Sequence, residues 1–311
     1  MCNTFVGKIS CVRMTARALG KDDFMYASQR EQVVDDDGVL AFYPFDDGAV
    51  GASAVGTNQV RNAVNPVMCA GHVVKYSSGS PSITWDDDRP GTYIYAGKRG
   101  NKPIYVSPGS IHMTSGTTGS SGTIHFYDLG AKMSTCTDGH TVEYFLKLDD
   151  SAFTESAYSF AYKAGYFFDG EEPKNFNLYM PFAMSYASGR QFRYSIGPYT
   201  GAHSTNRNLA FDLWNGAWHH VAVVQSREVT VATGDVPAST NYFVTVYVDG
   251  ISYNTIQFDG IEPLTSGTLT LGNYAHHGKY SCLKVTNRAL SADEFLYATD
   301  RERKGFMVIF K

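Results

Sequence analysis

The sequence predicts an all-β protein whose antiparallel strands form a sandwich or a barrel. After Gly139, short segments of alternating apolar and polar residues recur at strand spacing, with turns between them. The Asp-Gly pair at 249–250 lies between two such segments, VTVYV and ISYNTIQF. This pair favours a type I′ hairpin turn, because both turn positions need a positive φ. Aromatic residues are also abundant, with 21 Tyr and 19 Phe among 311 residues, as is typical of half-buried strands.

The N-terminal part of the chain is less regular. Residues 1–34 mix helix-forming residues with charges and predict an N-terminal extension that contains one or two short helices. A turn of three Asp residues and Gly38 then precedes the apolar strand VLAFYPF. Residues 46–66 are small and polar and predict a long loop before the strand HVVKYS. Between 77 and 122, turn-rich stretches separate the short strands TYIYA and PIYVS, and strands resume with TIHFYDL.

Regular strands fill the second half of the chain. The expected strands are TVEYFLKL, YSFAYKAGYFF, FNLYMPFAMSYA, QFRYSIG, LAFDLW, HHVAVVQ, FVTVYV, SYNTIQF and GTLTLG. A short C-terminal helix is expected at 291–301, because Ser291 and Glu294 have the spacing of a capping box. GFMVIFK, the last seven residues, predicts a closing strand. Residues 35–311 are therefore expected to form one domain that follows the N-terminal extension.

Charge and hydropathy exclude two classes of partner. The net charge is −4 and no stripe of Lys and Arg is present, so nucleic acid is not an expected partner. No run of about 18 apolar residues occurs, so no membrane span is expected. The first residues lack the apolar core of a signal peptide. The chain is therefore either not secreted by that route or a fragment of a longer exported protein.

Sequence motifs that carry chemistry are scarce. There is no GxSxG, HExxH, Gly-rich phosphate loop or CxxC pair. The five cysteines are Cys2, Cys11, Cys69, Cys136 and Cys282. Their spacing fits neither a zinc site nor a dense disulfide framework, and free thiols are expected, with a single disulfide as the alternative.

Six segments together carry a family resemblance. They are GVLAFYPFDDG, HTVEYFLKLDD, NGAWHHVAVVQ, VTVYVDG, LTLGNY and VTNRALSADEF. In this order, between residues 38 and 300, the chain resembles the laminin-G-like and concanavalin A-like jelly-roll domains, especially those of bacterial surface and secreted proteins. The resemblance implies a two-sheet antiparallel jelly-roll sandwich with a long insertion at 76–135. It also implies binding of glycans or proteins, with a calcium ion in some members, while other members are glycoside hydrolases or lyases.

Two departures from the family pattern affect the expected chemistry. The acidic pair that helps hold the structural cation corresponds here to Ser281 and Cys282, which are poor ligands for a hard cation. The Glu-x-Asp-x-x-Glu strand of the jelly-roll glucanases is absent, and the nearest acids, Glu143 and Asp212, have no carboxylate two residues further on. We therefore expect no catalytic residues.

Aromatic and histidine residues beside turns are the candidate ligand-binding residues. They are Trp214, Tyr166, Tyr199, Tyr274, His276 and His277. An aromatic ring near a turn can stack on the apolar face of a sugar, and Trp214 is the best placed, in the turn LWNGAW. Trp218 and the two following histidines match a strand opening of the family, which implies that the Trp fills the core and a His bonds backbone.

Calcium is the candidate cofactor, with Asp46 and Asp47 as its ligands. These two carboxylates follow the first core strand, where the fold often brings oxygen ligands near a cation. A solvated turn is the alternative interpretation of this acid pair, and of Asp86–Asp88 as well.

The sequence therefore predicts a non-catalytic module that recognises carbohydrate or protein, as a lectin or adhesion domain does. Its expected partner is a glycan or a surface protein, and its expected location is extracellular or at the cell surface. One alternative is a structural subunit of a surface layer, appendage or virion, which would associate with itself. A second alternative is a glycoside hydrolase or polysaccharide lyase with an unfamiliar site.

Overall fold

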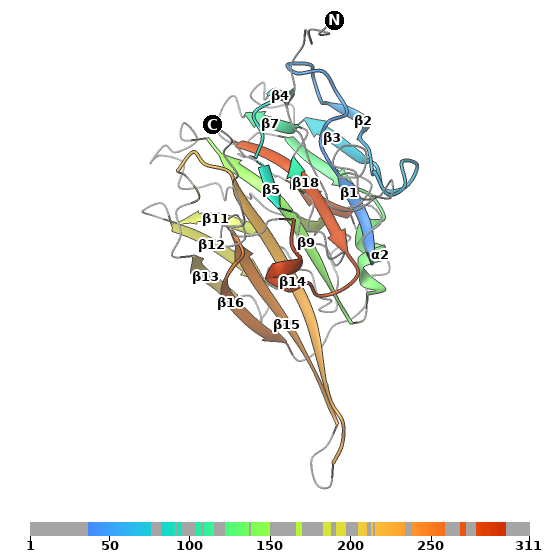
Figure 1. Ribbon diagram of the computed structural model, residues 1–311, viewed down its shortest axis with the longest axis vertical. Helices are drawn as coiled ribbons and strands as arrows, with labels where there is room; N and C mark the ends of the chain where they lie inside the picture. Colours follow the sequence, from blue (N-terminus) through green and yellow to red (C-terminus); the bar gives the residue numbers. More distant parts are fainter. Residues whose placement is uncertain are drawn as a thin grey trace, which may run out of the picture.

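The structure is a computed structural model, and two antiparallel sheets dominate it (Figure 1). The residues that it describes are 37–75, 82–90, 92–94, 104–106, 109–114, 122–136, 138–149, 166–169, 183–187, 191–196, 205–209, 213, 215–233, 238–258, 268–271 and 278–296. The predicted N-terminal extension and the predicted closing strand lie outside these residues.

The larger sheet, sheet A, has eight strands in the order β16-β15-β14-β9-β18-β7-β4, with β1 also paired to β18. Its strands are β1 (Val39–Tyr43), β4 (Ser82–Asp86), β7 (Ser110–Thr114), β9 (Gly139–Leu148), β14 (His219–Thr230), β15 (Ser239–Val248), β16 (Ile251–Phe258) and β18 (Gly278–Thr286). All of these strand pairs are antiparallel. Neighbours in this sheet are often far apart in sequence, so its order depends on long-range pairing.

The second sheet, sheet B, has the order β10-β17-β8-β3-β2. Its strands are β2 (Gly56–Val60), β3 (Gly71–Lys75), β8 (Gly122–Phe126), β10 (Tyr166–Asp169) and β17 (Thr268–Leu271). Two small sheets accompany the sandwich, one of β11 (Ala183–Ala187), β12 (Gln191–Ile196) and β13 (Thr205–Leu209), the other of β5 (Thr92–Ile94) and β6 (Ile104–Val106). The predicted all-β jelly-roll sandwich is thus confirmed.

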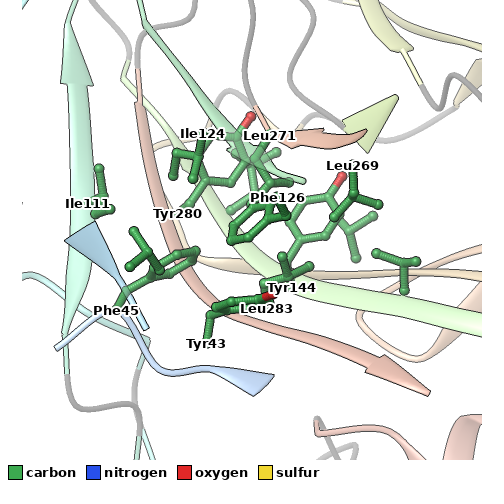
Figure 2. Close-up of a cluster of buried hydrophobic side chains, with 14 of the residues drawn as sticks. Tyr43, Phe45, Ile111, Ile124, Phe126, Tyr144, Leu269, Leu271, Tyr280 and Leu283 are labelled. Atoms are coloured by element: carbon green, nitrogen blue, oxygen red, sulfur yellow. The ribbon is translucent and has the colours of Figure 1, made fainter. Parts of the chain in front are cut away.

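The apolar core lies between the two sheets (Figure 2). Tyr144 of β9 and Tyr280 of β18 project from sheet A, and Phe126 of β8 projects toward them from sheet B. The ring of Tyr43 on β1 meets that of Phe126 at a centroid distance of 4.4 Å. Because side chains alternate along a strand, the odd-numbered residues of β9, such as Lys147, lie on the outer face of sheet A.

Some elements differ from the sequence predictions. β2 lies inside the segment 46–66 that was predicted as a loop, and the helix α2 (Leu129–Ser134) was not predicted. The range 76–135 supplies β4 and β7 to sheet A and β8 to sheet B. The two sheets of the sandwich therefore depend on strands from this range.

The structure corrects the type and the length of the predicted C-terminal helix. The capping box of Ser291 and Glu294 is present, but the helix is a 3-10 helix that spans only Ala292–Glu294. Phe295 is extended, with ψ 163°, and the next backbone N–H, that of Leu296, donates to the buried carboxylate of Glu143. Burial of these two side chains against sheet A therefore ends the helix, although the local signal favours it.

The predicted type I′ turn is confirmed at Asp249 and Gly250. Their φ angles are 51° and 76°, and Val248 pairs directly with Ile251 across the two-residue loop. The Asp249 carboxylate also accepts the backbone N–H of His220 at 2.8 Å and contacts the His219 ring at 2.8 Å. The turn therefore fixes the start of β14 as well as joining β15 to β16.

We expect Asp249→Ala to lower the free energy of unfolding by about 2 kcal/mol, through a lost acceptor and a left-handed backbone that Ala tolerates poorly. Asp249→Asn keeps an acceptor oxygen and a residue that tolerates positive φ, so its loss should be less than half as large. Urea unfolding of the three proteins measures the difference. Equal losses in the two variants would contradict this account of the turn.

Candidate functional site

A row of side chains crosses adjacent strands on the outer face of sheet A. Lys147 of β9 lies opposite Lys279 of β18, and Lys279 lies opposite His112 of β7. His112 lies opposite Thr84 of β4. Trp218 precedes β14 and donates its indole N–H toward the same place. Directly opposed residues of an antiparallel sheet share a face, so strand pairing alone brings these side chains together.

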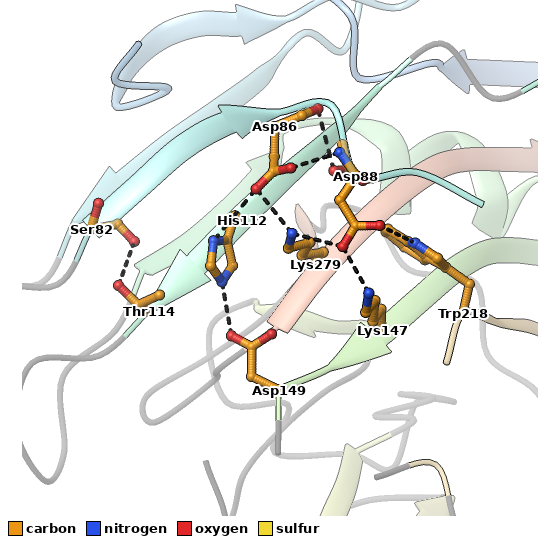
Figure 3. Close-up of polar contacts among 10 residues, drawn as sticks. Ser82, Asp86, Asp88, His112, Thr114, Lys147, Asp149, Trp218 and Lys279 are labelled. Atoms are coloured by element: carbon orange, nitrogen blue, oxygen red, sulfur yellow. Dashed lines mark hydrogen bonds and ion pairs between the residues drawn. The ribbon is translucent and has the colours of Figure 1, made fainter. Parts of the chain in front are cut away.

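The carboxylates of three aspartates bind the side chains of this row (Figure 3). Asp88, in the turn after β4, accepts hydrogen bonds from Lys147 at 2.8 Å, from Lys279 at 2.8 Å and from Trp218 at 3.0 Å. The other two carboxylates hold His112 from both sides, Asp149 at 2.8 Å and Asp86 at 3.6 Å. We call Thr84, Asp86, Asp88, His112, Lys147, Asp149, Trp218 and Lys279 the polar row.

Hydrogen bonds fix the charges in the polar row. Partial burial would raise the pKa of Asp88, but the hydrogen bonds from Lys147, Lys279 and Trp218 hold that pKa well below its ordinary value. Burial likewise would lower the pKa of Lys279, but its bonds to Asp88 and Asp86 raise it above the ordinary value. Both shifts favour the ionised carboxylate of Asp88 and the ionised ammonium of Lys279 at neutral pH.

The side chains of the polar row are partly exposed. The side chain of Asp88 is 34% exposed, those of Lys147 and His112 are each 26% exposed, and that of Asp149 is 21% exposed. Its charged donors and acceptors alternate, and each can bond a hydroxyl group. Within the described part of the chain, no group of three or more His, Cys, Asp or Glu side chains is arranged to hold a metal ion.

The neighbouring part of the outer face is covered by the C-terminal strap, residues 288–296. Beneath the strap, Glu143 pairs with the Lys284 ammonium at 2.9 Å and with the His220 ring at 3.0 Å, and all three side chains are fully buried. Its carboxylate also accepts the Leu296 N–H at 2.7 Å.

Burial by itself would raise the pKa of Glu143. The ammonium of Lys284 and the bonds from His220 and Leu296 nevertheless lower it to about 2. Glu143 is therefore a buried, ionised group that fastens the strap, and no substrate reaches it there.

The structure leaves most of the predicted ligand residues untested. Trp214, Tyr199, Tyr274, His276 and His277 lie outside the described residues, as does Asp212. Tyr166 begins β10 and pairs with Leu271 at the edge of sheet B, with its side chain not among those described. A ligand role for these residues stays a prediction.

The predicted calcium ligands lie in the turn after β1. Asp47 accepts the backbone N–H of Arg61 at 3.0 Å, as expected of a carboxylate that orders a turn. At the positions of the family's acidic pair, the Ser281 hydroxyl donates to the carbonyl of Gly109 at 2.6 Å, and Cys282 is fully buried. The calcium site at Asp46 and Asp47 stays a prediction.

Trp218 differs from its expected role in the core. Trp218 is only partly buried and packs on the outer face, against the cluster that contains Phe42 and Phe145, rather than in the central core. His219 bonds the side chains of Asp249 and Asn215, and His220 bonds that of Glu143.

Sequence reasoning missed the polar row because its members come from strands whose pairing is not local. The acid run at Asp86–Asp88 was its visible signal.

Two curved antiparallel layers around one apolar core define this chain as a jelly-roll β-sandwich. A family model described as the concanavalin A-like lectin/glucanases superfamily matches residues 117–295, more than half of the chain. The chain belongs to this superfamily.

Solved structures with a similar fold are distant in sequence. Domain 4 of AbnA, an extracellular arabinanase of Geobacillus stearothermophilus in complex with arabinotriose, has 14% identity and a TM-score of 0.48, over 84% of this chain and 97% of that one. A botulinum neurotoxin type C structure has 8% identity and a TM-score of 0.44, over 85% of this chain and 50% of that one. The binding domain of Paraclostridial Mosquitocidal Protein 1 has 11% identity and a TM-score of 0.40, over 83% and 51%. Comparison with curated proteins gives no match.

No helix in the described ranges is long and apolar enough to cross a membrane.

Proposed function

We propose that this domain is a non-catalytic recognition module that binds carbohydrate at the polar row, at an extracellular or cell-surface location. Membership of a superfamily of lectins and glucanases supports a carbohydrate ligand. The observation that carries the proposal is the arrangement of charged donors and acceptors across neighbouring strands on the outer face of sheet A, where their side chains are partly exposed. Strands lie about 4.8 Å apart, so the row offers hydrogen-bonding groups at regular intervals along a saccharide.

The chemistry of the polar row suits polyhydroxylated ligands. Sugar hydroxyls both donate and accept, and the row supplies carboxylates as acceptors and ammonium groups as donors. Hydrogen bonds to charged groups are roughly twice as strong as neutral ones, which favours specific binding on a partly wet surface. The bonds among Asp88, Lys147 and Lys279 hold these groups in place before a ligand arrives, and such preorganisation lowers the entropic cost of binding.

The end of the row formed by His112 and Asp149 provides the test. We expect the double variant His112→Ala and Asp149→Asn to weaken glycan binding by at least about tenfold, because a lost bond to a charged group costs about 1.5–3 kcal/mol. Glycan-array screening followed by titration calorimetry on the best ligand measures this. Val67→Lys, at an exposed position outside the polar row, is the control and should bind as the wild type does.

Two results of this experiment would contradict the proposal. One is the absence of any glycan ligand on the array. The other is a ligand whose affinity the double variant leaves unchanged. In the second case, Trp214→Ala with Tyr274→Ala tests whether the predicted loop residues make the contact instead, which would move the site away from the polar row.

A further inference from the structure

The strands β14 and β15 extend beyond the rest of sheet A. β9 pairs with β14 only as far as Gly139 opposite Ser226, whereas β15 pairs with β14 as far as Thr230 opposite Ser239. β16 joins β15 only from Tyr242 onward. Residues 227–230 and 239–241 therefore form a two-stranded ribbon, which projects at the bottom of Figure 1. We call this ribbon the β-arm.

The direction of the backbone groups along β14 follows from two contacts. The carbonyl of His220 accepts the N–H of Asp249, at the end of β15, whereas the carbonyl of Gln225 lies beside Gly139 of β9. Backbone groups alternate between the two sides of a strand, so odd-numbered residues of β14 face the β9 side. Val229 therefore directs its N–H and C=O away from β15, at a position where no described strand pairs with it.

The edge of the β-arm carries exposed apolar side chains. Val229 is 55% exposed and Val231 is 73% exposed, and both are β-branched residues that favour strands. Natural edge strands are usually protected by Lys, Pro or a bulge. The segment 228–231 contains no Lys or Pro, Glu228 is its one charged residue, and the pairing of residues 228–230 with β15 has no register shift. An isolated two-stranded ribbon is marginally stable in water, so a further strand would stabilise the β-arm.

We propose that a second copy of this chain pairs with the β-arm, β14 edge to β14 edge, in antiparallel orientation. The sequence REVTV is compatible with its own copy when the pairing is centred on Val229. Val229 then lies opposite Val229 of the second copy, and Arg227 lies opposite Val231. Both central residues direct their backbone groups toward each other, as a hydrogen-bonded antiparallel pair requires.

No like charges oppose each other in this register. Glu228 lies opposite Thr230, and the Arg227 guanidinium is already paired with Asp138 on its own chain. The exposed valines would be buried together in the joint, which removes apolar surface from water. A joint of this few residues buries less surface than a standard interface, which buries about 800 Å² per partner. The association is therefore weak in solution, and it is favoured where many copies share one surface.

The oligomeric state tests this inference. We expect the sedimentation-equilibrium mass of the wild type to rise toward twice the monomer mass as concentration increases. Val229→Lys places two ammonium groups directly opposite each other and should weaken the association by at least about tenfold. Val229→Pro should do the same, because it removes an N–H that the joint needs and that no described strand of the monomer accepts. Both variants should keep the far-UV circular dichroism of the wild type.

Val67→Lys is the matched control, since Val67 is 90% exposed and lies outside the β-arm. It should associate as the wild type does. A wild type that stays monomeric over the whole concentration range would overturn the inference. Association that survives both Val229 variants, or that Val67→Lys weakens equally, would also overturn it, because the contact would then lie elsewhere. None of these outcomes depends on glycan binding.

Discussion

Glu143→Gln is expected to lower the free energy of unfolding by about 3–5 kcal/mol, the usual cost of removing one partner of a buried ion pair. Glu143 and Lys284 are both fully buried and lie 2.9 Å apart. Replacing the carboxylate by an amide of the same shape leaves the Lys284 ammonium without its counter-charge in the interior. It also weakens the acceptor for the His220 ring and for the Leu296 N–H.

Denaturant unfolding at neutral pH measures this loss, and an exposed ion pair supplies the control. Asp138, whose side chain is 79% exposed, pairs with Arg227. Asp138→Asn should cost less than about 1 kcal/mol, as exposed ion pairs do. Adding Lys284→Met to Glu143→Gln should recover part of the lost stability, because the unpaired buried charge is then removed. A loss in Glu143→Gln as small as that in Asp138→Asn would show that the buried pair does not hold the strap.

The same contact has a pH dependence of known sign. The pKa of Glu143 is lowered from its ordinary value of 4.5 to about 2 in the folded protein. The stabilisation is therefore fully present above about pH 4.5 and is lost as the pH falls toward 2. Above that window, the strap remains fastened to sheet A, so this carboxylate does not act as a switch near neutral pH.

Local signals in the sequence predicted local structure well. Alternation gave the strands of the second half, and Asp249-Gly250 predicted a turn whose two φ angles are positive in the structure. The capping box of Ser291 and Glu294 forms as expected, yet the helix stops after one turn. The helix does not continue because the Leu296 N–H donates instead to the carboxylate of Glu143, which is 153 residues away in sequence. Local propensity cannot report such a contact.

The polar row could not be predicted for the same reason. Asp88 and Lys279 are 191 residues apart, and they meet because β18 lies between β9 and β7 in sheet A. The acid run at Asp86–Asp88 was visible, but a solvated turn explains such a run equally well in a single sequence. Side-chain alternation placed Lys147 on one face of its strand, and only the order of the strands shows which residues share that face.

His140 is expected to make the fold sensitive to mild acid, in a pH window above that of Glu143. It is an even-numbered residue of β9, on the core side, and its side chain is almost fully buried. Among the described residues, neither ring nitrogen has a hydrogen-bond partner. Burial lowers the pKa of His140 from 6.5 to about 4, so the folded protein holds a neutral imidazole where the unfolded chain takes up a proton.

The unfolded state therefore binds more protons between about pH 6.5 and pH 4, and stability falls as the pH is lowered through this range. At about 1.4 kcal/mol per pKa unit, the loss approaches about 3 kcal/mol at the lower end. Denaturant unfolding at intervals from about pH 7 to pH 4.5 follows this loss in the wild type and in His140→Leu, in which no proton can bind at this position. The variant should lose markedly less stability over the interval, whatever its stability at neutral pH. Equal slopes in the two proteins would show that another group is responsible for the acid sensitivity.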